Sequence, residues 1–141
     1  MSFLLDTNVI SELRKHPDRR DQSVDRWARQ LTPADSYLSV ITLLELRAGI
    51  EHKRRTDPAQ AEALDKWLND AVLPVYAGRV LDIDKKVADG AARLHVPHRR
   101  PAHDALIAAT ATTYGLTLAT RNESDFLPMG ITLVNPWKDG R

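Results

Sequence analysis

The chain has 141 residues, with 20 lysines and arginines against 19 aspartates and glutamates, and it contains no cysteine. A net charge of +1 is too small to indicate a nucleic-acid partner by itself, and the lack of cysteine excludes disulfides, thiol nucleophiles and cysteine-ligated zinc. Because no basic leader precedes an apolar stretch and no apolar run approaches about 20 residues, we expect one soluble, cytoplasmic domain without a membrane segment.

The first half of the chain predicts short buried strands that alternate with helices. The run FLL at residues 3–5 is continuous and apolar, which is typical of a strand buried in a parallel sheet. Further along, Val24, Trp27 and Leu31 recur at helical spacing. In chain order we expect a strand at 3–5, a helix from 7 to about 15, a helix at 23–31, a strand at 37–39 and a helix from about 42 to 54.

The second half continues the alternation. Pro58 opens a long helix, and the helix that begins at Asp104 has almost no polar surface in its first two turns, which indicates burial. Strands that alternate with helices predict an α/β sandwich with helices on both faces of a parallel sheet. The remaining expected elements are a strand at 80–83, a helix from 84 to 94, a loop at 95–103, a strand at 116–119, a helical turn around 125 and a strand at 131–134.

Four acidic residues stand at strand ends or in the first turns of helices: Asp6, Glu45, Asp104 and Asp125. Right-handed crossovers bring such junctions to one edge of a parallel sheet, so these carboxylates are expected to converge. Converging carboxylates repel one another and either take up protons or bind a cation. Because carboxylate oxygens favour Mg²⁺ or Mn²⁺, which polarise phosphoryl oxygens and make hydroxide available, the pattern predicts metal-dependent phosphodiester hydrolysis.

Two of these acids also have a purely structural explanation. Asp6 stands where its side chain would cap the following helix. Thr42 and Glu45 have the spacing of a capping box, which explains the glutamate locally. The residues alone leave both alternatives open.

Three polar residues beside the acids are candidates for a supporting role: Thr7, Thr120 and Asn122. Their hydroxyl and amide groups are suited to orient a metal-binding carboxylate or a phosphate. The alternative is that Thr7 and Asn122 only cap a helix or form a turn.

Four segments, in this order and at this spacing, resemble the PIN-domain nucleases, and more narrowly the toxins of the VapBC class: LLDTNVISEL, SVITLLELRAG, HDALIAATA and TLATRNESDF. The segment AGRVLDID and the tripeptide NPW are similar to the FitB-like branch of that class. The resemblance covers residues 1–137 and leaves 138–141 as a short tail.

The resemblance implies a sheet of order 3-2-1-4-5 and an endoribonuclease that depends on Mg²⁺ or Mn²⁺. It assigns metal binding and catalysis to Asp6, Glu45, Asp104 and Asp125, with the three polar residues in support. It further implies a homodimer, neutralisation by a cognate antitoxin, and DNA contact only through that antitoxin. The chain departs from the family pattern at His103, where the family more often has a small or apolar residue.

Two other functions fit part of the pattern. A phosphoacceptor signalling domain also has an acid after its first strand and a hydroxyl after its fourth, but Asp6 lacks the acidic neighbour that such a site needs. A FitB-like partner in a DNA-bound repressor complex, with little nuclease activity, would keep the fold and all four acids.

An RNA substrate requires basic groups near the acidic pocket, because phosphate contacts dominate the affinity. We favour Arg99 and Arg100, since their loop leads directly into the helix of Asp104. The alternative is a solvated charged loop. Other candidates are Arg14, Lys15, Arg19, Arg20 and residues 53–55.

Overall fold

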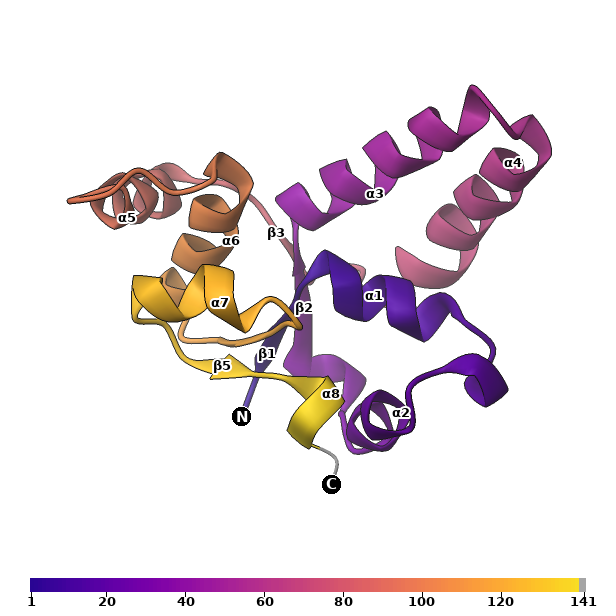
Figure 1. Ribbon diagram of the computed structural model, residues 1–141, viewed down its shortest axis with the longest axis horizontal. Coiled ribbons are helices and arrows are strands. Elements are labelled where there is room, and N and C mark those ends of the chain that lie inside the picture. The colour runs from indigo at the N-terminus through magenta and orange to yellow at the C-terminus, as the bar shows by residue number, and fades with distance from the viewer. Residues whose placement is uncertain (140–141) are drawn as a thin grey trace.

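A computed structural model describes residues 1–139 and shows a parallel sheet between two groups of helices (Figure 1). In this part of the chain the strands are β1 Phe3–Leu5, β2 Ser36–Ser39, β3 Val80–Leu81, β4 Thr117–Ala119 and β5 Leu133–Val134. Every neighbouring pair is parallel, and the order across the sheet is β3-β2-β1-β4-β5. The predicted α/β class and the strand order 3-2-1-4-5 are confirmed.

The helices follow the predicted alternation. They are α1 Thr7–Arg14, α2 Gln22–Arg29, α3 Val40–Arg54, α4 Pro58–Trp67, α5 Lys85–Leu94, α6 Ala102–Thr113, α7 Glu123–Phe126 and α8 Pro136–Asp139. The edge strands β3 and β5 are shorter than predicted, and each pairs with a neighbour on one side only. Across residues 1–139, no helix combines the length and the apolar composition that a bilayer crossing requires.

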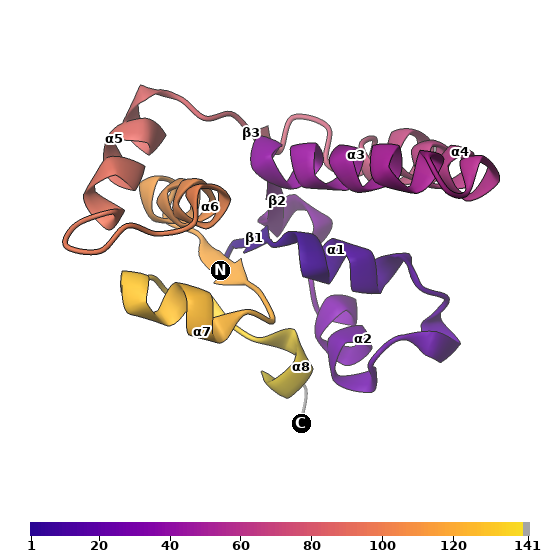
Figure 2. The ribbon, with the colours of Figure 1, turned by 45° about the horizontal axis from the view of Figure 1, so that its top comes forward.

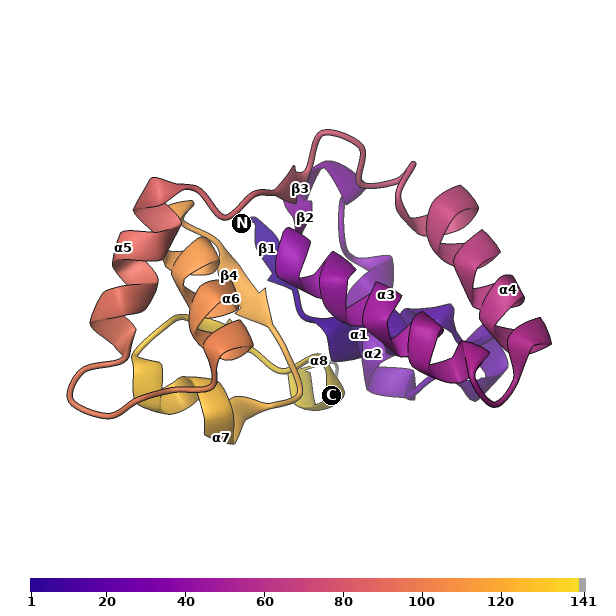
Figure 3. The same ribbon diagram turned by 90° about the horizontal axis from the view of Figure 1, so that it is seen from above.

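The sheet buries both of its faces, as a three-layer sandwich requires. Adjacent strand residues point to opposite faces, so Leu5 and Ala119 join the core beneath α1–α4, while Leu4 and Leu118 join the core beneath α6 and α7. The turned views show the same division, with α1–α4 on one side of the sheet and α5–α7 on the other (Figures 2 and 3). This burial on both faces explains the continuous apolar run of β1.

Two helices begin earlier than the sequence predicts. Helix α3 starts at Val40, because the Ser39 hydroxyl at the end of β2 accepts a hydrogen bond from the backbone N–H of Ile41 (3.0 Å). The capping box at Thr42, one of the two alternatives left open for Glu45, is therefore wrong. Helix α6 starts at Ala102 after Pro101, which puts Asp104 inside its first turn.

The end of the chain is described only in part. The predicted tail of residues 138–141 begins inside α8, to which residues 138 and 139 belong. Residues 140–141 lie outside the described residues.

The start of α3 leads to a test with a matched pair of variants. Ser39→Ala is expected to lower the free energy of unfolding by about 1 kcal/mol, because it removes the cap. The Thr42 hydroxyl is buried without a hydrogen-bond partner in the described part of the chain, so Thr42→Val should leave stability unchanged or raise it. Urea unfolding of both variants checks this, and a larger loss for Thr42→Val would restore the capping box.

Candidate active site

Asp6 stands at the junction between β1 and α1 and is only 5% exposed. Its backbone N–H continues the pairing with β4 by bonding the Ala119 carbonyl oxygen (3.0 Å). Its side chain caps α1 through the N–H of Thr7 (2.8 Å) and also accepts a hydrogen bond from the Thr120 hydroxyl (2.7 Å). The capping role and the site role predicted for Asp6 are therefore compatible, since one oxygen serves the helix and the other faces Thr120.

Asn8 connects the two strand ends that form this junction. Its amide nitrogen lies 3.4 Å from both Asp6 Oδ2 and Thr120 Oγ1. Its amide oxygen accepts a hydrogen bond from the backbone N–H of Arg121 (3.2 Å). Asn8 thus holds the loop after β4 against the start of α1.

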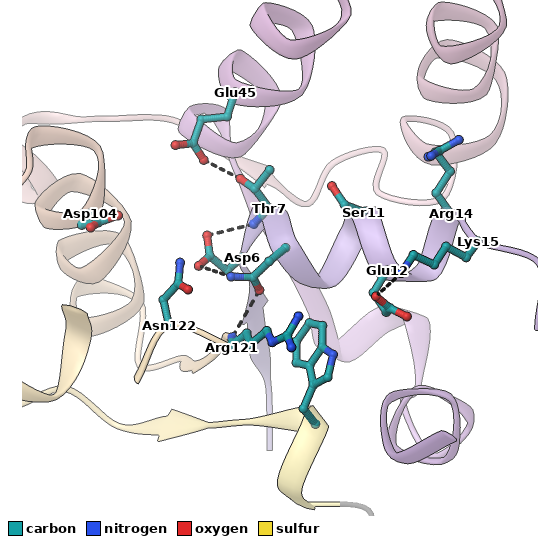
Figure 4. A pocket seen from close by; sticks show the side chains of 12 residues that line it. Asp6, Thr7, Ser11, Glu12, Arg14, Lys15, Glu45, Asp104, Arg121 and Asn122 are labelled. Atoms are coloured by element: carbon teal, nitrogen blue, oxygen red, sulfur yellow. Dashed lines mark hydrogen bonds and ion pairs between the residues drawn. The ribbon is translucent and has the colours of Figure 1, made fainter. Parts of the chain in front are cut away.

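Glu45 projects from the second turn of α3 toward α1 (Figure 4). One carboxylate oxygen accepts a hydrogen bond from the Thr7 hydroxyl (2.5 Å), and the other lies 3.2 Å from Nδ1 of His103. Because Ser39 caps α3, Glu45 is free of the capping role that its spacing from Thr42 suggested. Thr7 acts here as the residue that orients Glu45.

Asp104 enters from the first turn of α6 and is partly buried. Asp125 lies exposed on α7, and it does not line the pocket that the other three acids share. The negative charge of Asp125 nevertheless contributes to raising the pKa of Asp104. The structure brings together three of the four predicted acids and keeps the fourth at their margin.

Asp6, Glu45 and Asp104 line one open cavity of about 610 Å³. The cavity lies at the carboxyl ends of the strands, which is where α/β sheets bind ligands. Figure 4 shows the side chains of Asp6, Glu45 and Asp104 around the same space, with Asn122 beside them. The lining residues are Asp6, Thr7, Asn8, Ser11, Glu12, Arg14, Lys15, Glu45, Asp104, Arg121, Asn122 and Trp137.

The acids dominate the electrostatics at the centre of the cavity. Burial raises the pKa of Asp6 above its usual range, against the lowering effect of the hydrogen bond from Thr120. Burial also raises the pKa of Asp104, and the negative charges of Asp125, Asp6 and Glu45 raise it further. Within residues 1–139 no lysine or arginine forms an ion pair with any of these four acids.

The chemistry of this donor set fits a hard divalent cation. Carboxylate oxygens of Asp6, Glu45 and Asp104 face one cavity, and among residues 1–138 no lysine or arginine forms an ion pair with them. Mg²⁺ and Mn²⁺ are commonly held by one or two carboxylates and by water. In the described residues 1–139, however, no three acidic or histidine side chains are already gathered closely enough to hold an ion.

The remaining predicted residues fall into two groups. Thr120 is buried and bonded to Asp6, and Asn122 lines the cavity while its backbone N–H bonds the Thr120 hydroxyl (3.0 Å). Arg99 and Arg100 do not line the cavity. The Arg100 guanidinium donates to the carbonyl oxygens of Leu94 (3.2 Å) and Pro128 (3.4 Å), so it holds the loop in place.

Five lining residues were not assigned a site role from the sequence: Asn8, Ser11, Glu12, Arg121 and Trp137. Asn8 and Arg121 lie inside the recognised motifs, so their positions beside Asp6 and Thr120 were the available signal. Trp137 lies in the tripeptide NPW, but its approach to the cavity depends on the placement of α8, which no local pattern specifies.

The comparisons with known proteins agree with this fold. The family profile described as PIN domain matches residues 3–127. Toxin FitB of Neisseria gonorrhoeae (strain ATCC 700825 / FA 1090) is 39% identical over 97% of this chain and 99% of its own length. VapC ribonuclease Y4jK of Sinorhizobium fredii (strain NBRC 101917 / NGR234) is 39% identical over 96% of this chain and 98% of its own.

Solved structures are similar over the same extent. FitAB bound to an IR36 DNA fragment aligns with a TM-score of 0.86 and 34% identity, over 96% of this chain and 95% of that chain. A toxin–antitoxin complex from Klebsiella pneumoniae aligns with a TM-score of 0.64 and 26% identity, over 96% of this chain and 98% of that chain.

The raised pKa of Asp104 leads to a prediction for the metal-free protein. A carboxyl whose pKa is higher in the folded state stabilises the fold at low pH, and that contribution is lost as the pH rises through the folded pKa. In chelator, Asp104→Asn should therefore melt a few degrees above the parent at neutral pH. The gap should narrow as the pH falls toward about 4, the ordinary pKa of aspartate.

The control is Asp89→Asn, which makes the same chemical change at an exposed position of α5. Its melting temperature should follow that of the parent at each pH. A lower melting temperature for Asp104→Asn at neutral pH would mean that this carboxylate stabilises the fold.

Proposed function

Since the chain belongs to the PIN-domain family, we propose that it is an endoribonuclease that acts as the toxin of a toxin–antitoxin pair and hydrolyses RNA phosphodiester bonds. The observation that carries this proposal is the convergence of Asp6, Glu45 and Asp104 on one open cavity without a lysine or arginine partner among residues 1–139. The similarity to Toxin FitB and to VapC ribonuclease Y4jK supports both parts of the proposal.

The proposed cofactor is Mg²⁺ or Mn²⁺, held by Asp6, Asp104, Glu45 and Asp125. When bound, such a cation polarises a phosphoryl oxygen and makes hydroxide available near neutral pH. The hydrogen bonds at Asp6 would fix one carboxylate in place at the strand end. The exposed Asp125 would add its negative charge to that of the other three acids from the margin of the cavity.

The polar residues around the acids are proposed to position them. The Thr7 hydroxyl holds one oxygen of Glu45, and the Thr120 hydroxyl holds one oxygen of Asp6. Asn122 presents its side chain to the cavity, where an amide is able to contact a phosphate oxygen. None of these contacts supplies a positive charge, so the acids keep their attraction for a cation.

The proposed partners follow from the family and from the solved structures. The similarity to a toxin–antitoxin complex supports a cognate antitoxin as the inhibitor. The similarity to FitAB bound to DNA supports DNA contact within such a complex. The family resemblance supports a homodimer, which light scattering on the purified chain would test, and the RNA substrate implies action in the cytoplasm.

A second candidate function is favoured by the same DNA-bound structure. In this alternative the chain works mainly as a FitB-like partner in a DNA-bound repressor complex and has little nuclease activity. RNA cleavage by the purified chain, with and without divalent metal, separates the two functions. The phosphoacceptor function is set aside, because the chain belongs to the PIN-domain family.

Cleavage by acid variants tests the proposed site. Asp6→Asn and Asp104→Asn should each reduce RNA cleavage at least about a hundredfold, because each removes a charge that would bind the cation. The exposed variant Asp89→Asn should cleave like the parent, and a chelator should abolish the activity of both. Full activity in Asp6→Asn and Asp104→Asn, with the fold intact by circular dichroism, would refute the assignment.

The loop before α6 provides a separate test. Arg99 is exposed, so Arg99→Ala should weaken RNA binding across sequences and lower its salt dependence, if this arginine contacts phosphate. Arg100→Ala is expected to loosen the loop as well, because its guanidinium bonds two carbonyl oxygens. Unchanged binding and an unchanged salt slope for Arg99→Ala would indicate a solvated loop.

A further inference from the structure

Arg121 stands on the wall of the acidic cavity, one residue after Thr120. Its backbone N–H donates to the amide oxygen of Asn8 (3.2 Å), and the amide nitrogen of Asn8 lies 3.4 Å from Asp6 Oδ2. The guanidinium lies over the Trp137 ring, with its central carbon 5.2 Å from the ring centroid. Figure 4 shows the Arg121 side chain below the acids, on the side opposite Glu45.

Trp137 is itself held in place by a set of polar contacts. The backbone N–H of Trp137 donates to the side-chain oxygen of Asn135 (3.0 Å), and the amide nitrogen of Asn135 donates to Glu123 (3.1 Å). Lys138 pairs with the same oxygen of Glu123 (2.7 Å). These contacts join α8 to α7. They hold the indole of Trp137 where its ring contacts the Arg121 guanidinium.

Several of the other basic candidates are committed to contacts within the chain. Arg20 donates to the carbonyl oxygens of Leu13 and Lys15 and pairs with Asp25. Arg54 pairs with Glu51, Glu62 and Asp65 between α3 and α4. The guanidinium groups of Arg20 and Arg54 therefore stabilise the fold and are occupied by acceptors of the chain itself.

Arg121 differs from those residues in what its guanidinium contacts. The residue is exposed, and among residues 1–138 its guanidinium forms no ion pair. An aromatic face attracts a guanidinium without occupying its N–H groups, so these stay available to an acceptor. Lys15, which lines the same cavity, instead pairs with Glu12 (2.9 Å).

We propose that Arg121, seated on Trp137, binds a phosphate of the RNA strand that enters the acidic cavity. The inference rests on the proposed ribonuclease function. The carboxylates repel the phosphates of an RNA strand, and a fixed cation on the same wall would hold its backbone beside them. A guanidinium donates two parallel hydrogen bonds to a phosphate. Because the contact with the Trp137 ring already restricts the Arg121 side chain, less conformational entropy is lost when the phosphate binds. In this arrangement Arg121 is a binding residue and Trp137 a positioning residue.

The test measures binding of a labelled single-stranded RNA to the full chain carrying Asp104→Asn, so that cleavage does not interfere. Adding Arg121→Gln should weaken binding roughly tenfold, as expected for loss of a charge-assisted contact. It should also lower the salt slope by about 0.7, the value for one phosphate contact on a single strand. Arg121→Lys should recover the slope but only part of the affinity.

The role of the ring is tested by combining variants. Trp137→Leu should weaken binding when Arg121 is present and change it little in the Arg121→Gln background. Additive losses would overturn the positioning role of Trp137. Thermal unfolding of each variant confirms that the fold is kept.

Two matched arginines serve as comparisons. Arg93→Gln removes the same charge from an exposed position of α5 and should bind RNA like the parent. Arg14→Gln removes the other lining arginine, which Figure 4 shows farther along α1 and away from the acids. A loss in Arg14→Gln with none in Arg121→Gln would overturn the proposal.

Cleavage by chains that keep Asp104 distinguishes failure of this proposal from failure of the proposed function. If the unmodified chain cleaves RNA, Arg121→Gln should raise KM roughly tenfold with kcat little changed. Equal KM values for Arg121→Gln and Arg93→Gln would overturn the phosphate contact alone. If Arg121→Gln loses affinity for the antitoxin but not for RNA, the guanidinium binds an acidic group of the protein partner and the proposal is wrong. No cleavage and no RNA binding by the unmodified chain would overturn both.

Discussion

The buried carboxylate of Asp6 is the constraint on which the arrangement of the site depends. A buried charge is costly unless hydrogen bonds compensate it, and here they come from the N–H of Thr7, the Thr120 hydroxyl and the Asn8 amide. Thr120 reaches Asp6 only because β1 and β4 pair in register, with Leu5 opposite Ala119. The central strand pair therefore builds the site, and a shift of that register would leave the charge without its donors.

The elements of the fold were predictable because their signals are local. The apolar run of β1 and the helical spacing in α2 follow from burial on one or both faces, and both elements formed within a residue or two of the expected bounds. The strand order required the family resemblance, since local patterns do not specify which strands pair. The start of α3 was misplaced, because Ser39 and Thr42 are both good caps and only the end of β2 decides between them.

The site was predictable to the extent that topology determines it. Parallel strands and right-handed crossovers bring Asp6, Glu45 and Asp104 to one edge, and the structure places them around one cavity. Topology alone does not determine the directions of the side chains. The contact of His103 with Glu45 and the stacking of Arg121 on Trp137 join residues far apart in the sequence, so no spacing pattern announces them.

The distribution of positive charge gives the site its chemical character. The chain has nearly equal numbers of basic and acidic residues, yet within residues 1–139 no lysine or arginine forms an ion pair with Asp6, Glu45, Asp104 or Asp125. Arg20, Arg54 and Arg100 instead form tertiary contacts elsewhere in the fold. Had such an arginine paired with the acids, it would have stabilised the fold and removed the attraction for a cation. The site thus stays acidic because these three arginines bind elsewhere. The repulsion among its carboxylates lowers the stability of the fold, as is common at functional sites.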